Sequence, residues 1–387
     1  WRELIMYDII INGGGMVGQA FALSMAKSDY SIAIIEPNNP NPVLADKFHT
    51  RVSAITPKSE KLLKNIGAWD FIKRKKSFTS TSVWDQNSHG NLAFHAQDES
   101  LDYLGHIIEN DAIQQALFSA LSQIGVTFIS DKLDTFDKID DGYQVNLEKG
   151  DSINCKLLIA ADGARSRIRE LAGVEFSEHD YQQKAIVCNI ESPQGFDNTT
   201  WQRFLSDSII ALLPLGEHQA SVVWSAENTL ADELMGLSKE DFAKRLSAGV
   251  EYCFGEFEVV SSIQAFPLIE RSSQDYVQEN LALIGDAAHN IHPLAGQGVN
   301  LGFSDIIELS QQLNASSKPL ADYFVLRQYA RARRLDNELM AKTMTGLNWI
   351  YKENNEPLRW LRGFGMNIIN DNPMLKSFLQ KHALGSS

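Results

Sequence analysis

One short segment limits the fold of this chain more than any other: a β-like run followed by a glycine-rich turn and a helix. Residues 7–12 read YDIIIN, which is apolar and β-branched, and GGGMVG follows directly. The next residues have the apolar spacing of a helix, and a second strand-like run, SIAIIE, spans 31–36. Strand, glycine turn, helix and strand in this order form a βαβ unit, so the sequence predicts an α/β domain.

The glycines of this turn have the spacing of a nucleotide-binding loop. Gly13, Gly15 and Gly18 form G-x-G-x-x-G, and Glu36 ends the second strand. Such glycines let the backbone approach a pyrophosphate at a helix N-terminus, and an acid at the next strand end accepts hydrogen bonds from ribose hydroxyls. The alternative is a plain glycine turn. We favour dinucleotide binding because strand, helix and acid are all in place, but the pattern does not separate NAD from FAD.

The sequence pattern of the chain changes after residue 180. From 181 to 264, strand-like runs are separated by polar turns, which predicts a mostly antiparallel sheet. The predicted fold is therefore α/β (α+β overall), with a Rossmann-like domain interleaved with an antiparallel β-sheet domain and a helical C-terminus. We expect a discontinuous nucleotide-binding domain at 6–75, 101–180 and 265–320, a substrate-binding sheet domain at 76–100 and 181–264, and C-terminal helices at 321–387.

Composition narrows the class of protein. The 387 residues are 44% apolar and 22% charged, with a formal net charge of −14. These values are typical of a globular protein and argue against a nucleic-acid partner, which requires a basic surface. No apolar run is long enough to cross a bilayer, and the first residues lack a signal-peptide pattern. We therefore expect a cytoplasmic protein.

Two further acids follow apolar strands. Asp162 and Gly163 end LLIAADG, and Asp286 ends LALIGD. An acid at such a strand end can accept hydrogen bonds from sugar-like hydroxyls, and the N-terminus of the helix that follows near Gly298 can stabilise developing negative charge.

The second of these segments also contains two histidines. His289 and His292 are three residues apart, which raises the alternative of a metal site. Pro293 and the glycines beyond it do not favour a rigid ligand platform, so we expect no metal.

The motifs together resemble those of a known family. In this order, GGGMVG, AADGARSRIRE and GDAAHNIHPLAGQGVNLG are similar to the FAD-dependent aromatic hydroxylases, the single-component flavoprotein monooxygenases of the para-hydroxybenzoate hydroxylase type. RVSAI, LGHIIEN and YARARRLDN match the ubiquinone-biosynthesis branch. Within it, VSAITPKSEKLL, VWDQNSHG and LGHII most resemble the 2-polyprenylphenol 6-hydroxylases.

The resemblance implies roles for the first motif residues. Gly13, Gly15 and Gly18 are expected to hold the FAD pyrophosphate, and Glu36 the adenosine ribose. Arg51 matches an arginine that lies against the cofactor in this family.

The later motifs receive roles in the same way. Asp162 and Gly163 match a motif that engages the cofactor and the nicotinamide, and Asp286 matches the aspartate on the ribityl and pyrophosphate side of FAD. Pro293 and segment 296–300 match the wall beside the isoalloxazine ring, where main-chain N–H groups face the flavin. The residues implied for this wall are Pro293, Gly296, Gly298, Val299 and Asn300, of which Pro293, Gly298 and Asn300 are the expected catalytic set.

The implied activity is that of an FAD monooxygenase. It hydroxylates the ring of a polyprenylated phenol with O2 in ubiquinone biosynthesis, through a flavin C4a-hydroperoxide, with NADPH or NADH as electron donor. A ubiquinone-biosynthesis complex and peripheral contact with the inner face of the membrane are the expected partners. Two alternatives stay open: the same chemistry on another ring position or another aromatic substrate, and a non-catalytic prenyl-binding protein on the same fold.

The sequence indicates less about the residues that contact the substrate. Trp201, Phe204, Leu213 and Trp224 lie on strand-like runs and are candidates for the wall of an aromatic pocket, although core packing explains such residues equally well. The basic run RARR, at 331–334, is interpreted as a solvated helix face rather than a phosphate or partner site.

Overall fold

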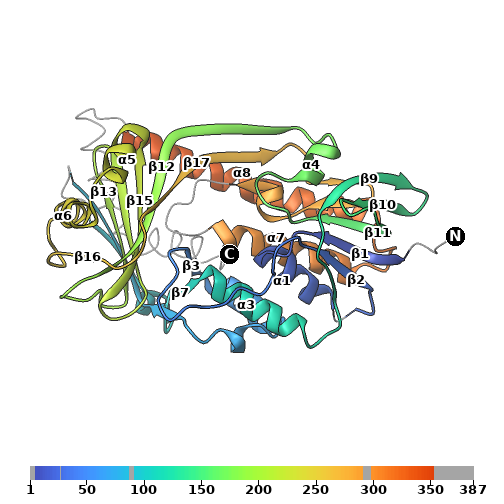
Figure 1. The fold of residues 1–387 in the computed structure, drawn as a ribbon, viewed down its shortest axis with the longest axis horizontal. Coiled ribbons are helices and arrows are strands. Elements are labelled where there is room, and N and C mark those ends of the chain that lie inside the picture. The colour runs from blue at the N-terminus through green and yellow to red at the C-terminus, as the bar shows by residue number, and fades with distance from the viewer. Residues whose placement is uncertain (1–4, 27, 87–90, 291–297, 353–387) are drawn as a thin grey trace.

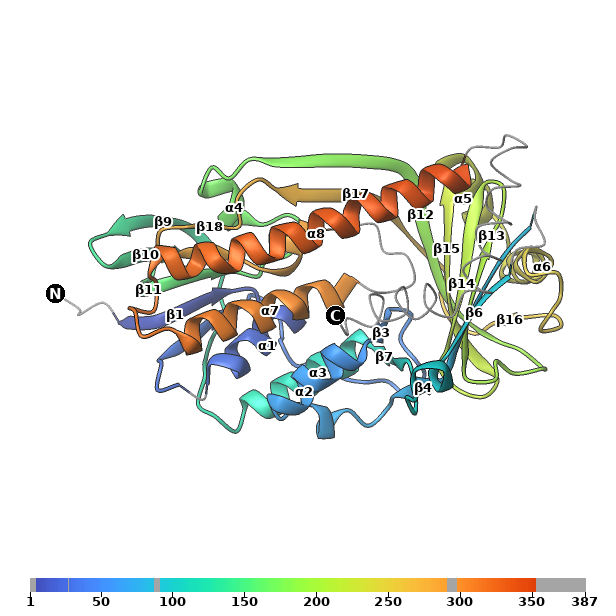
Figure 2. The same cartoon turned by 180° about the vertical axis from the view of Figure 1, so that it is seen from behind.

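The computed structural model describes residues 5–26, 28–86, 91–290 and 298–352, with the backbone alone for 91 and 339–352. Two sheet regions lie at opposite ends of an elongated molecule, joined by long strands along one side (Figure 1). A long helix crosses from one region to the other (Figure 2). This mixed α/β architecture confirms the predicted fold class.

The eight-stranded sheet contains the predicted βαβ unit. Its central strands are parallel in the order β19-β11-β1-β2-β8, with β18 antiparallel at one edge and the β9-β10 hairpin paired to β11. Residues 9–11 and 32–35 are buried, as expected for parallel strands covered on both faces. The strands are β1 (Met6–Asn12), β2 (Ile32–Ile35), β8 (Thr127–Ile129), β9 (Leu133–Ile139), β10 (Gly142–Leu147), β11 (Ser152–Ala160), β18 (Val277–Gln278) and β19 (Leu281–Leu283).

The nine-stranded sheet is antiparallel apart from one parallel pair, β5 with β13. Its order is β20-β17-β12-β15-β14-β13-β5-β6, with β16 paired to β12. The strands are β5 (Ser80–Asp85), β6 (Asn91–His95), β12 (Phe176–Glu191), β13 (Thr199–Phe204), β14 (Ser208–Pro214), β15 (Gln219–Glu227), β16 (Glu258–Val259), β17 (Gln264–Ser273) and β20 (His289–Asn290).

A small antiparallel sheet, β3 (Val52–Ile55), β7 (Gly105–Glu109) and β4 (Lys76–Phe78), connects the two regions. The expected domain boundaries at 181 and 264 fall inside β12 and at the start of β17, and both strands run from one region toward the other (Figure 1). The division into domains therefore stays a prediction.

Helices cover both sheets. The helices are α1 (Met16–Met25), α2 (Pro57–Asn65), α3 (Asn110–Leu121), α4 (Arg167–Leu171), α5 (Asn228–Met235), α6 (Lys239–Gly249), α7 (Gly298–Ala315) and α8 (Tyr323–Lys352), with 3-10 turns η1 (Trp69–Phe71), η2 (Ala96–Glu99) and η3 (Gly285–Ala287). One core joins the eight-stranded sheet to α1, α3, α7 and α8 and includes Phe21 and Phe303. A second core joins α5 and α6 to the nine-stranded sheet around Trp224 and Phe242.

Within the described residues, no helix combines the length and apolar character needed to cross a membrane.

Candidate functional site

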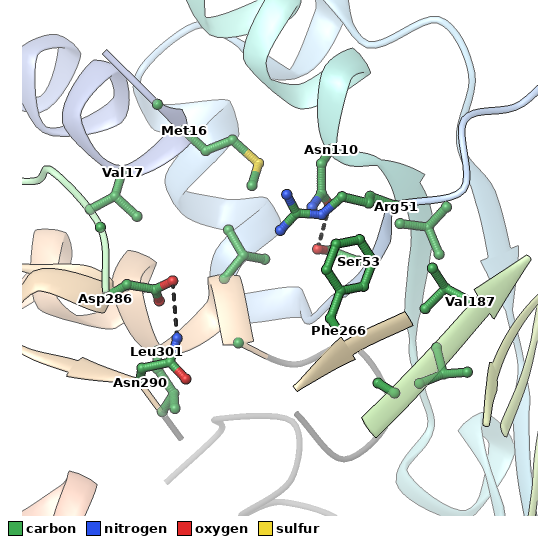
Figure 3. Close-up of a pocket in the computed structure, with 18 of the residues that line it drawn as sticks. Met16, Val17, Arg51, Ser53, Asn110, Val187, Phe266, Asp286, Asn290 and Leu301 are labelled. Carbon is green, nitrogen blue, oxygen red and sulfur yellow. Dashed lines mark hydrogen bonds between the residues drawn. The ribbon is translucent and has the colours of Figure 1, made fainter. Parts of the chain in front are cut away.

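A cavity of about 460 Å³ lies where the two sheet regions meet. Its lining comes from the glycine turn, β3, the strands β12, β15 and β17, η3, and the first turn of α7. Figure 3 shows Met16 and Val17 on one side, Arg51 and Phe266 on another, and Asp286 facing the space between them. The volume is within the range typical of ligand pockets.

The glycine turn fits tightly against the ends of β1 and β11. Gly13 has φ +113°, and a Cβ there would lie 2.2 Å from the carbonyl oxygen of Ala161. A Cβ on Gly18 would lie 1.9 Å from the carbonyl oxygen of Gly13. Around Gly15, by contrast, a Cβ would meet none of the described residues within 4 Å, and none of their side chains caps α1. The turn therefore leaves an uncapped helix N-terminus open toward the pocket.

Two side chains fix this turn. Glu36 Oε2 accepts a hydrogen bond from the N–H of Gly14 at 2.8 Å, so the acid does lie beside the glycines. Gln19 is wholly buried, and its Nε2 donates to the carbonyl oxygens of Gly14 at 2.6 Å and Pro40 at 3.1 Å. Gln19 was not predicted from the sequence, although it directly follows the last glycine of the motif.

Arg51 is exposed directly before β3 and lines the pocket, with its guanidinium carbon 5.8 Å from the centre of the Phe266 ring (Figure 3). The loop before it is held by an ion pair between half-buried Arg74 and buried Glu109. Arg74 Nη2 donates to Glu109 Oε1 at 3.0 Å, and the same oxygen accepts the N–H of His49 at 2.7 Å.

Asp286 is an exposed residue that lines the pocket, although protein atoms lie close around its carboxylate. Its Oδ2 accepts a hydrogen bond from Asn290 at 3.3 Å (Figure 3). Burial raises the pKa of Asp286 above its usual value, although His289, Asn290 and Arg51 each act to lower it. Among the described residues Asn290 is the donor to this carboxylate, and ligand hydroxyls can supply further hydrogen bonds to it.

Asp162 and Gly163 lie at the end of β11, next to the glycine turn, but only Gly163 lines the pocket. Asp162 Oδ2 accepts from the N–H groups of Arg167 at 2.8 Å and Ile168 at 3.3 Å, so this carboxylate binds the first turn of α4, whose N-cap is Ser166. Its other oxygen, Oδ1, is buried and has no partner within the described residues.

Gly298 and Val299 line the pocket at the start of α7. Asn300 is turned away from it: Nδ2 donates to the carbonyl oxygen of Ala54 at 2.8 Å, and Oδ1 accepts the N–H of Thr56 at 3.2 Å. The Asn300 side chain thus ties the first turn of α7 to the strand that follows Arg51.

Pro293, Gly296 and His292 lie outside the described residues. Within the residues that the structure does describe, no three His, Cys, Asp or Glu side chains gather as a metal site.

The nine-stranded sheet gives the pocket an apolar wall, which includes Val187, Val223, Phe266 and Leu268. The four residues considered from the sequence are not on it. Phe204, Leu213 and Trp224 are buried in the cores, and Trp201 lines a separate cavity of about 440 Å³. The core interpretation therefore holds for Phe204, Leu213 and Trp224.

The interpretation of RARR is wrong at one position. Arg331 and Arg334 are exposed, but Arg333 is 4% exposed, and its Nε lies 2.7 Å from Oδ1 of the fully buried Asp305. Oδ2 of Asp305 lies 2.6 Å from Nε2 of His289. Asp305 thus contacts the pocket-lining His289 from behind, a role that was not predicted from the sequence, although Asp305 lies three residues beyond the end of GDAAHNIHPLAGQGVNLG.

Comparison with known proteins agrees with this geometry. The FAD binding domain family matches residues 6–343. The crystal structure of p-nitrophenol 4-monooxygenase PnpA from Pseudomonas putida DLL-E4 superposes with a TM-score of 0.78 at 18% identity, covering 97% of both chains. Fold and family thus define the class: an FAD-dependent monooxygenase.

Two relatives narrow the class. The chain is 35% identical over 386 residues to 3-demethoxyubiquinol 3-hydroxylase of Escherichia coli (strain K12), covering 98% of both chains. It is 32% identical over 434 residues to the mouse mitochondrial ubiquinone biosynthesis monooxygenase COQ6, covering 98% of this chain and 91% of the relative. The chain belongs to the FAD-dependent hydroxylases of ubiquinone biosynthesis. This confirms the resemblance to the ubiquinone-biosynthesis branch and sets aside the non-catalytic alternative, while the nearer resemblance to the 2-polyprenylphenol 6-hydroxylases stays a prediction.

Proposed function

We propose that this enzyme hydroxylates the aromatic ring of a polyprenylated phenol, with NADPH or NADH as electron donor and O2 as oxygen source. One observation carries the proposal: the pocket joins a polar half, around the glycine turn and Asp286, to an apolar half on the nine-stranded sheet. A polar half suits a nucleotide and an apolar half suits a phenol ring, so both reactants can meet in one cavity.

The polar half fits FAD. The uncapped N-terminus of α1 at Gly15 offers backbone N–H groups to a pyrophosphate, and Glu36 lies where ribose hydroxyls are bound in dinucleotide sites. The Asp286 carboxylate accepts hydrogen bonds from hydroxyls of the ribityl chain, and Arg51 lies against the cofactor. Gly163 also lines this part of the pocket.

When bound, FAD supplies the oxygen and electron-transfer chemistry. The protein supplies position and electrostatics. The first turn of α7, at Gly298, Val299 and Asn300, directs its N–H groups and positive dipole end toward negative charge on the flavin. Pro293 and Gly296 are assigned to the same wall. Val187, Val223 and Phe266 exclude water and orient the ring carbon that is hydroxylated.

The ring position has two candidates. The sequence motifs favour a 2-polyprenylphenol, which is hydroxylated at carbon 6, whereas the 35% identical relative is named for 3-demethoxyubiquinol. Both molecules carry a polyprenyl tail, which requires delivery from the membrane. We therefore include peripheral contact with the inner membrane face and a ubiquinone-biosynthesis complex in the proposal.

The test is direct assay of the purified FAD-loaded protein. Each of the two substrates is supplied with a short prenyl tail, with NADPH or NADH, under ¹⁸O2. We expect oxidation of the nicotinamide that depends on the substrate, and a product with one ¹⁸O atom in a new ring hydroxyl. Mass spectrometry detects the label, and NMR gives the ring position. Nicotinamide oxidation without labelled product from either substrate would contradict the proposed substrate class.

A further inference from the structure

A buried carboxylate holds the segment that carries Asp286. Asp305, on α7, has no exposed surface. Its Oδ2 accepts the N–H of Gly285 at 2.8 Å and lies 2.6 Å from His289 Nε2. Its Oδ1 accepts from Arg333 Nε, on α8, at 2.7 Å. One side chain therefore joins η3, β20, α7 and α8.

The partners of Asp305 are themselves fixed. Arg333 Nη2 donates to Asn337 Oδ1 at 2.8 Å, and Asn337 Nδ2 donates to the Tyr276 hydroxyl at 3.2 Å. The Tyr276 ring packs on His289, with ring centres 5.8 Å apart. This closed set, called here the Asp305 network (Tyr276, His289, Asp305, Arg333 and Asn337), leaves little freedom to any member.

The network brackets Asp286 along the chain. Gly285 comes directly before it and His289 three residues after it, and both bind Asp305. From the other side, Arg169 Nη1 donates to the carbonyl oxygen of Ala287 at 2.9 Å. The backbone around Asp286 is thus held before and after it, while its side chain faces the pocket (Figure 3).

Charge in the network is balanced. Burial acts to raise the pKa of Asp305, but His289 and Arg333 outweigh it and hold that pKa below its usual value. Asp305 is therefore ionised at neutral pH and paired with Arg333, as a buried charge must be. Its hydrogen bond to the Gly285 N–H is charge-assisted, which strengthens its hold on the segment.

We propose that Asp305 is a positioning residue for FAD: with His289 it fixes the backbone at Gly285 and β20, so that the Asp286 carboxylate meets the hydroxyls of the cofactor. This inference rests on the cofactor role of Asp286 under the proposed function. It also accounts for His289, which serves as a partner of Asp305 rather than as a metal ligand or a catalytic base.

The test is a double-mutant cycle on FAD affinity. Flavin is removed from wild type, Asp305→Asn, Asp286→Asn and the double variant, and FAD is titrated back by fluorescence. We expect Asp286→Asn, which alters the direct ligand, and Asp305→Asn, which alters the residue that orients it, each to weaken FAD binding on the order of tenfold. The double variant should bind little more weakly than Asp286→Asn, because Asp305 acts through Asp286.

Glu60→Gln is the matched control. Glu60 is also a buried carboxylate beside a histidine, with His106 Nδ1 at 3.2 Å and the Tyr103 hydroxyl at 2.7 Å, but it does not line the pocket. This variant should lower the thermal stability of the flavin-free protein and leave FAD affinity unchanged. A loss of affinity in Asp305→Asn alone therefore separates positioning from general destabilisation.

His289→Gln is the second variant, used also where Asp305→Asn does not fold, because it retains the Asp305 charge and the Gly285 bond. We expect a smaller loss of FAD affinity. Wild-type affinity in both Asp305→Asn and His289→Gln, or losses that multiply in the double variant, would overturn the proposal. Wild-type affinity in Asp286→Asn would instead refute the cofactor role of Asp286.

Discussion

Asn12 Nδ2 donates a hydrogen bond to Asp162 Oδ2 at 3.0 Å, which joins two motifs that are 150 residues apart in the chain. Both residues are beside the glycine turn, at the carboxyl ends of the parallel strands β1 and β11. A polar residue at the end of an apolar strand is unusual, and this bond explains it. The end of β1 is thereby fixed relative to the start of α4, where Asp162 accepts the N–H of Arg167.

Asn12→Ala is expected to destabilise the protein. It removes the hydrogen bond that the buried Asn12 donates to the half-buried Asp162 carboxylate, so the free energy of unfolding should fall by about 1 to 3 kcal/mol. Urea denaturation of the flavin-free protein measures the change. Asn146→Ala, which removes hydrogen bonds on the β10 hairpin, should cost less, and equal losses would argue against a special role for the Asn12 bond.

Two glycines of the same turn should separate structural from cofactor roles. Gly18→Ala forces a Cβ into the Gly13 carbonyl and should cost about 1 to 3 kcal/mol of stability. Gly15→Ala meets open space in the protein, so the flavin-free protein should keep its melting temperature while FAD binding weakens. Melting curves and FAD titrations check both. Full FAD affinity in Gly15→Ala would place the pyrophosphate elsewhere.

Asp286→Asn should show a pH-dependent effect on the flavin-free protein. Because the folded-state pKa of Asp286 is raised, its contribution to stability is present below the unfolded pKa of about 3.9 and is lost as pH rises through the folded value. The neutral amide of the Asp286→Asn variant does not titrate, so the variant does not lose this stability as pH rises. The variant should therefore gain melting temperature relative to wild type as pH rises from about 4 to about 7. A difference that does not change with pH would contradict this.

Arg74→Gln should destabilise the loop before Arg51. Glu109 is 2% exposed and would lose its half-buried cationic partner, so the free energy of unfolding should fall by about 1 to 3 kcal/mol. Lys132→Gln breaks an exposed pair with Glu148 and should change stability by less than about 1 kcal/mol. Urea denaturation of the two variants compares them directly. Similar losses in the two variants would mean that the pair of Arg74 with Glu109 contributes little to stability.

The sequence by itself determined the local units. Gly13, Gly18 and Glu36 predict the βαβ turn because the requirement for glycine and for an acid at the next strand end is local to some 30 residues. The acid at the end of LALIGD was found in the same way. These signals, with the order of the motifs, identified the class of fold and the family.

Only the tertiary structure decided which residues meet. On β15, Val223 faces the pocket while Trp224 faces the second core, because successive side chains point to opposite faces of a sheet. The strand could be predicted from its composition, but the face that turns toward the cofactor could not. The same holds for Arg333: its spacing indicated a solvated helix, and its burial follows from Asp305, a partner 28 residues away that only helix packing brings within 2.7 Å.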